Sequence, residues 1–165
     1  MQEPITLRPV CADDEIFLFG LFCIVHEHTL ANADISAEQS KQLLRMQFTA
    51  QQSQYHSSFA NADFDLVLRN AVPVGSLYAL RGPDEFVLID ITLLPEHRNC
   101  GIGAQLVKGL IRQANVAEKT LEAHVRISNP AWRLWKRLGF QRHSDDGVYM
   151  RIRVPSDYER SGPRS

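Results

Sequence analysis

Two glycines between an apolar strand and an amphipathic helix constrain this 165-residue chain more than any other feature. The junction, Leu93–Ala104, reads Leu-Leu-Pro-Glu-His-Arg-Asn-Cys-Gly-Ile-Gly-Ala. Glycine tolerates tight backbone turns, and the helix predicted over 102–117 starts there with N–H groups that have no partner within the helix. Together with the positive end of the helix dipole, these groups favour an anion. Two common phosphate loops do not fit, because Leu106 replaces the last glycine of a dinucleotide fingerprint and no Gly-Lys-Ser/Thr is present.

The junction resembles the central motif of the GNAT superfamily of N-acetyltransferases. In that family, Arg-x-x-Gly-x-Gly/Ala holds the pyrophosphate of acetyl-coenzyme A (acetyl-CoA). A second segment, 129–140, resembles the family's Asn-x-x-Ala-x-x-Leu-Tyr-x-x-x-Gly-Phe helix and follows the first motif after one helix and one strand. The resemblance covers the chain well from about Glu85 to Met150 and rests on pattern alone before that.

The resemblance implies a set of residues that contact acetyl-CoA as a co-substrate. The loop amides and Arg98 hold the pyrophosphate, while the backbone amides at the end of the strand bond the pantetheine arm. Core packing explains the two leucine side chains equally well, a helix cap explains Asn129, and Cys100 fits a filler at a variable loop position. The implied set is Leu93, Leu94, Arg98, Asn99, Cys100, Gly101, Ile102, Gly103, Ala104, Asn129, Ala131 and Trp135.

Acetyl transfer to an amine needs a route for the amine proton, because an alkyl amine with a pKa of about 10.4 is mostly charged at pH 7. Asp90 is the candidate general base, since it lies on the strand that enters the loop, at a position where many relatives carry a carboxylate that works through water. A structural or acceptor-binding carboxylate is the alternative for Asp90. Glu96 and Glu122 are weaker candidates, because turn and surface positions explain them equally well.

Trp135 stands where relatives often carry the tyrosine that protonates the leaving thiolate. An indole cannot deliver a proton at neutral pH, so Trp135 is expected to pack on the pantetheine or bracket the thiol. Tyr149 or water is then left to donate the proton, although a surface position explains Tyr149 as well. This departure also supports an alternative function, a non-catalytic acyl-CoA-binding sensor or scaffold module.

The fold that the resemblance implies is an α/β fold of the GNAT type, with a mixed, mostly antiparallel sheet of about seven strands and helices on both faces. Residues 1–155 are expected to form one domain, followed by a polar tail over 156–165. The first predicted helix, which ends at about His28, is apolar nearly all round and should be mostly buried. The second opens with a capping box over 36–39. The last helix should have Asn129 as its cap and Pro130 at its first position, and Gly139 should lie just past its end.

The acceptor is expected to be a primary amine on a small molecule or a peptide, with small molecules slightly favoured. The second helix is rich in glutamine, and Gln47, Gln51 and Tyr55 are candidates for acceptor contacts, with a solvated helix face as the alternative. A wide cavity beside Leu93 and Trp135 would instead favour a longer acyl chain. Homodimers are common for this architecture, and the closing hairpin is the expected interface.

Composition excludes several other classes of function. The 18 Lys and Arg residues against 19 Asp and Glu give a net charge of -1, so no basic field predicts nucleic acid or an anionic membrane as a partner. The chain lacks an apolar run of about 18 residues and a secretory signal, and is expected to be cytoplasmic. His26 and His28 point to different helix faces, so we expect no metal.

Overall fold

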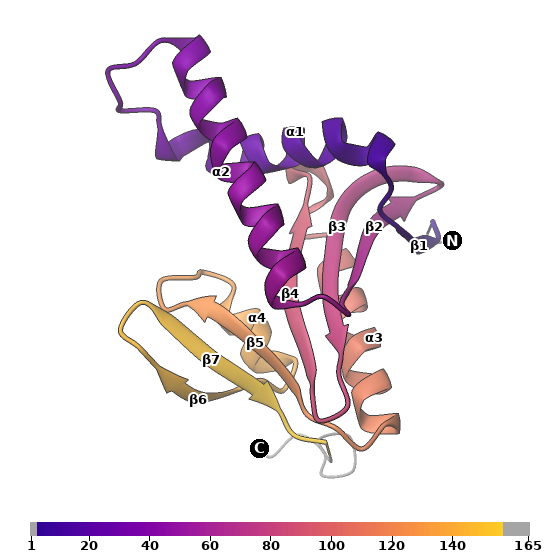
Figure 1. The fold of residues 1–165 in the computed structure, drawn as a ribbon. Helices are drawn as coiled ribbons and strands as arrows, with labels where there is room; N and C mark the ends of the chain where they lie inside the picture. The colour runs from indigo at the N-terminus through magenta and orange to yellow at the C-terminus, as the bar shows by residue number, and fades with distance from the viewer. Residues whose placement is uncertain (1–2, 157–165) are drawn as a thin grey trace. The chain divides into compact units, whose positions relative to one another are not determined.

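The computed structural model describes residues 3–156, so all of the predicted tail except Ser156 lies outside the described residues. The strands form one seven-stranded sheet in the order β1-β2-β3-β4-β5-β7-β6, and helices flank it (Figure 1). β4 and β5 pair in parallel, whereas β1–β2, β5–β7 and β6–β7 pair antiparallel. The predicted α/β class with a mixed, mostly antiparallel sheet is confirmed. Within residues 3–156, no helix is long and apolar enough to cross a membrane.

The described residues form seven strands, four α-helices and three short 3-10 helices. The strands are β1 (Ile5–Pro9), β2 (Asp63–Arg69), β3 (Val72–Arg81), β4 (Phe86–Leu93), β5 (Leu121–Arg126), β6 (Gln141–Asp145) and β7 (Tyr149–Val154). The α-helices are α1 (Glu15–His26), α2 (Ala37–Ser58), α3 (Ile102–Val116) and α4 (Trp132–Arg137). Three short 3-10 helices are η1 (Ala12–Asp14), η2 (Glu27–Thr29) and η3 (Pro95–His97).

The chain divides into two compact units, each made of two separate stretches. The first unit contains the chain up to Leu77 together with Ile91–His97, and the second contains Tyr78–Asp90 together with the chain from Arg98 onward. β3 and β4 therefore contribute residues to both units. The single domain expected over 1–155 stays a prediction.

The first unit has a small aromatic core between α1, α2 and β2. Phe48 of α2 lies with its ring centroid 5.5 Å from that of Phe19 and 5.6 Å from that of Phe22, and Leu66 is buried beside them. The expectation that α1 is mostly buried is wrong for one side of this helix, because Ile16 is 84% exposed. A helix that packs along one side buries only the residues on that side. Because α1 is apolar nearly all round, its remaining apolar residues are left exposed.

The predicted capping box at the start of α2 is confirmed. The Ser36 hydroxyl accepts a hydrogen bond from the backbone N–H of Gln39 at 3.1 Å, and the Gln39 side-chain oxygen accepts one from the backbone N–H of Ser36 at 2.9 Å. These bonds satisfy two donors that the first turn leaves without partners. The start of α2 is therefore fixed by four consecutive residues.

Gly75 of β3 is buried where no side chain fits against the end of β4. A Cβ atom there would lie 2.2 Å from the carbonyl oxygen of Thr92 and 2.7 Å from Leu93 Cδ2. We expect Gly75→Val to lower the free energy of unfolding by about 3 kcal/mol or more, because the backbone of β4 must move to admit the side chain. Urea denaturation measures this change.

Gly20 of α1 provides the control for Gly75. A Cβ atom at Gly20 would meet nothing within 4 Å, so Gly20→Ala should raise the free energy of unfolding by about 0.5–1 kcal/mol. Equal stability of Gly75→Val and the native protein would show that β4 yields without cost at this contact.

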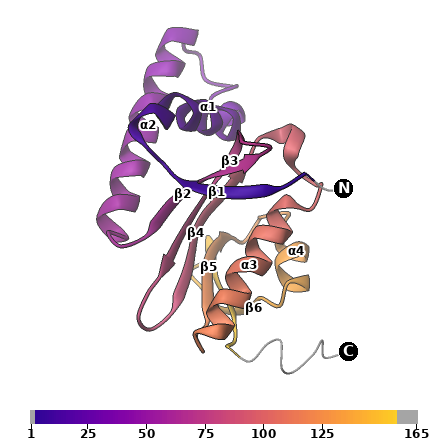
Figure 2. The same cartoon turned by 90° about the vertical axis from the view of Figure 1, so that its right-hand side faces the viewer.

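The second unit is built around the parallel pair β4–β5, with α3 as the connection (Figure 2). Three residue pairs join these strands, from Phe86↔Leu121 to Leu88↔Ala123. β4 then continues for five residues to Leu93 beyond the last pair. The family resemblance implies that the two strands separate here.

The last helix, α4, begins later than the sequence predicts. Asn129 Oδ1 accepts a hydrogen bond from the backbone N–H of Ala131 at 2.8 Å, so Asn129 closes a turn before the helix, which starts at Trp132. The predicted end is confirmed: Gly139 has φ +101°, and the N–H of Phe140 bonds the carbonyl of Trp135 at 3.1 Å. A left-handed glycine followed by this longer bond is a common helix ending.

Candidate active site

The predicted loop turns into α3 through two residues in the left-handed region. Asn99 has φ +57° and Gly101 has φ +88°, while Arg98, Asn99 and Cys100 are exposed. Asparagine is among the few residues besides glycine that adopt this conformation without a large cost. The loop thus brings an exposed arginine side chain and a tight backbone turn to the start of one helix.

The start of α3 has the properties of an anion site. Gly101 is the N-cap, and a Cβ atom there would meet nothing within 4 Å. Among the described residues, no side chain caps this helix and no acidic residue occupies its first turn. The first N–H groups of a helix have no partner within it, and the described first turn of α3 adds no carboxylate against the positive end of the dipole.

Leu93 is the last residue of β4 and Leu94 follows it, and both are half-buried in the first unit. The N–H of Leu94 donates a hydrogen bond to the carbonyl of Val74 in β3 at 2.9 Å. The expectation that the Leu94 amide is free to bond the pantetheine arm is therefore wrong, because this N–H already donates its hydrogen bond to β3. The role implied for Leu93 stays a prediction.

Asp90 is half-buried in β4, two residues past the last pair with β5. Side chains alternate along a strand, so Asp90 and Leu88 lie on the same face of β4. Ala123 of β5, which pairs with Leu88, lies on that face too. Tyr149 pairs with Arg126 on the other face and is 41% exposed. The two residues that the sequence suggests for proton transfer therefore belong to opposite faces of the sheet.

Trp135 is buried in α4 and carries a polar atom without a partner. Its ring meets Phe140 edge to face, with ring centroids 5.5 Å apart. Its Nε1–H is buried and forms no hydrogen bond within the described part of the chain. A buried donor without an acceptor costs about 1–3 kcal/mol, so an acceptor atom on a ligand at this position would offset a real cost.

Comparison with known proteins identifies the fold. A family model described as FR47-like protein matches residues 72–150, just under half of the chain. The chain covers 92% of its own length and 99% of the PaiA N-acetyltransferase of Thermoplasma acidophilum in complex with coenzyme A, with a TM-score of 0.69 and 16% identity. The chain has the GNAT fold.

Two further solved structures show the same GNAT fold. A GNAT family acetyltransferase from Elizabethkingia anophelis with acetyl-CoA bound has a TM-score of 0.58 and 18% identity, over 92% of this chain and 97% of that one. The ribosomal-protein-S18-alanine N-acetyltransferase from Escherichia coli has a TM-score of 0.60 and 20% identity, over 92% of this chain and 94% of that one. No curated protein sequence matches the chain.

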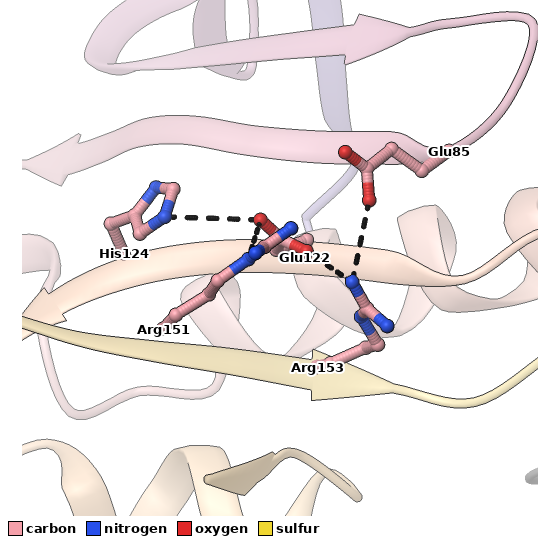
Figure 3. A network of polar contacts seen from close by, with 5 residues as sticks. All are labelled: Glu85, Glu122, His124, Arg151 and Arg153. Atoms are coloured by element: carbon pink, nitrogen blue, oxygen red, sulfur yellow. Dashed lines mark hydrogen bonds and ion pairs between the residues drawn. The ribbon is translucent and has the colours of Figure 1, made fainter. Parts of the chain in front are cut away.

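Glu122 of this GNAT fold is not the surface residue that the sequence suggests. Its side chain is 4% exposed and accepts hydrogen bonds from Arg151 Nε at 2.5 Å and from Arg153 Nη2 at 2.8 Å (Figure 3). Burial raises the pKa of Glu122, but the bonds from the two arginines outweigh it and hold that pKa below its ordinary value. The sequence analysis missed both arginines, although their alternation with Met150 and Ile152 indicates one shared face.

The glutamine-rich helix α2 borders a cavity that Gln47, Gln51 and Tyr55 do not line. A cavity of about 460 Å³ is lined by Glu38, Lys41, Gln42, Arg45 and Met46. Gln47, the first residue of the predicted acceptor set, is exposed on the opposite side of α2, because helical residues advance by about 100° each. The roles suggested for Gln47, Gln51 and Tyr55 stay predictions.

Proposed function

We propose that this protein is an acetyl-CoA-dependent N-acetyltransferase that moves an acetyl group to a primary amine. The observation that carries the proposal is the Arg98–Ala104 loop, whose left-handed Gly101 opens onto a helix start without a capping side chain or an acidic first turn among the described residues. Coenzyme A in one neighbour and acetyl-CoA in another support this assignment, since both share the fold.

The residues of this chain fit such a co-substrate. Arg98 and the amides of Ile102, Gly103 and Ala104 bind and orient a pyrophosphate, with charge-assisted hydrogen bonds that are about twice as strong as neutral ones. The Nε1–H of Trp135 supplies a donor for an acceptor atom on the pantetheine arm, and it has no partner among the described residues. When bound, the thioester supplies an acyl group that is activated for attack by a nucleophile.

Asp90 is the proposed general base and takes the amine proton through an ordered water. A base is useful because the charged ammonium form of the acceptor cannot attack. Trp135 cannot return a proton to the thiolate, so Tyr149 or water serves as the acid. A small-molecule amine is the favoured acceptor, with a peptide amine as the alternative.

One observation favours a second function, a non-catalytic acyl-CoA-binding sensor or scaffold. The residue at the position of the family's tyrosine is a buried tryptophan, Trp135. A module that only binds needs no acid at this position, and a buried indole adds apolar contact to the pantetheine.

The test is acetyl-CoA turnover across a panel of amines, measured as free thiol release, alongside calorimetric binding of acetyl-CoA. Binding with amine-dependent thiol release is the expected result. Binding without release on amines and peptides would select the sensor function. A protein that binds no acetyl-CoA would contradict both functions.

A further inference from the structure

We propose that one face of β5 and β7 binds an anionic group, a carboxylate or a phosphate, that the amine acceptor carries. This inference rests on the proposed function, because it names the chemical class of the acceptor. The face is called the arginine face below. It consists of Glu122, His124, Arg126, Tyr149, Arg151 and Arg153.

The antiparallel register brings these six side chains to one side of the two strands. Glu122 lies opposite Arg153, His124 opposite Arg151, and Arg126 opposite Tyr149. Figure 3 shows Glu122, His124, Arg151 and Arg153 close together on that side. The alternate residues of both strands occupy the other face and are buried: Leu121, Ala123, Val125, Met150, Ile152 and Val154.

The carboxylates near the arginine face pair with two of its three arginines. Both carboxylate oxygens of Glu122 are used, one by Arg151 and one by Arg153. Glu85 adds a weaker pair at the edge, 3.8 Å from Arg153 Nη2. Arg126 pairs with no carboxylate among residues 3–156, and its guanidinium lies 5.5 Å from the ring centroid of Tyr149. Asp146 interacts electrostatically with His124, so Arg126 is the arginine of this face that pairs with no carboxylate within the described residues.

Arg126 and Arg151 are placed to hold one anion between them. They occupy diagonal positions on the two strands, which puts their Cβ atoms about 7–8 Å apart. Arg151 donates its Nε–H to Glu122, so both terminal nitrogens stay outside this bond while the side chain is 36% exposed. A guanidinium already anchored on one edge loses little freedom when it binds a carboxylate or phosphate with the other. The anion would also remove the repulsion between the two cations.

The position of Arg126 relates this face to the acceptor. The β4–β5 pairing ends at Ala123, and Arg126 lies three residues further along β5. The resemblance implies that the thioester lies where these strands separate, while the start of α3 accounts for the pyrophosphate. An anion at Arg126 is therefore assigned to the acceptor, whose amine then passes the end of the β4–β5 pairing to reach the water held by Asp90 on the other face of the sheet. The net charge of -1 favours one small anionic group over a polyanion.

The test compares acceptors that differ only in their charge. β-Alanine is paired with β-alaninamide, and O-phosphoethanolamine with ethanolamine, so the two pairs distinguish carboxylate from phosphate. In the native protein we expect kcat/KM to favour the anionic member of at least one pair by about tenfold or more. Arg126→Gln should lower that ratio about tenfold, because it removes one of the two proposed anion ligands. The variant should fold normally, because Arg126 pairs with no carboxylate within residues 3–156. Arg133→Gln, at an exposed arginine of α4, is the matched control and should keep the native ratio.

Calorimetric binding of the same four amines gives a readout that does not depend on turnover. Anion-selective binding that Arg126→Gln weakens supports the arginine face, with or without turnover. Equal binding and turnover of both members of each pair would overturn it while leaving the acetyltransferase proposal intact. A preference that survives in Arg126→Gln would overturn it too. If no amine is turned over, the proposed function is contradicted. The calorimetric comparison of the four amines then tests the anion site by itself.

Discussion

Gly103→Trp is expected to weaken acetyl-CoA binding by about 10³-fold or more, because the indole would cover the first turn of α3. Gly103 is half-buried two residues after the N-cap, among the amides proposed to bind the pyrophosphate. Charge-assisted hydrogen bonds contribute about 1.5–3 kcal/mol each, and two lost bonds account for an effect of this size. Isothermal titration calorimetry with acetyl-CoA measures the change.

Two variants distinguish the loss of the site from general damage to α3. Gly103→Ala adds one methyl group and keeps the amides accessible, so its affinity should stay within a few-fold of the native value. Lys108→Trp places the same indole on an exposed position of α3 and should bind normally. Native affinity in Gly103→Trp would remove this loop as the pyrophosphate site.

Asp90→Asn is expected to lower kcat/KM by about 10²-fold or more at neutral pH, the lower end of what general base catalysis contributes. The amide keeps the shape of the side chain but cannot accept a proton from the amine. The loss should shrink as the pH approaches the pKa of the acceptor, about 10.4 for an alkyl amine, because the amine then loses its proton to solvent. Thiol release measured from neutral to alkaline pH gives this profile.

Asp84→Asn is the control for Asp90, since Asp84 is an exposed carboxylate in the turn between β3 and β4. It should keep the native rate and profile. An Asp90→Asn protein with the native pH profile would leave Asp90 a structural or acceptor-binding carboxylate.

Local sequence was enough to predict the features that depend on a few neighbouring residues. Gly101 and Gly139 both adopt the left-handed conformation that their positions beside helices suggest. Ser36 and Gln39 form the predicted capping box within one turn. The loop motif and the segment after β5 were also sufficient to indicate the GNAT fold. The hydrogen bonds of the capping box and of the helix end at Gly139 join residues no more than five positions apart, so the local sequence is enough to predict them.

The features that sequence patterns missed depend on residues far apart in the chain. Glu122 looks like a surface residue because its neighbours alternate in polarity, yet Arg151 and Arg153 bury and pair it across the β5–β7 register. Gly75 gives no signal of its contact with Thr92, since only the approach of β4 makes a Cβ atom impossible there.

The sequence by itself determined the start of α2, the end of α4 and the loop that leads into α3, because local backbone preferences and hydrogen bonds within a turn specify them. Only the tertiary structure decided which carboxylates are buried, which amides are already bonded and which side chains share a face. Strand register controls these properties, and a shift of one residue would exchange the two faces of a strand. Pairing between β5 and β7 therefore decides whether Arg126 lies on the arginine face or in the core.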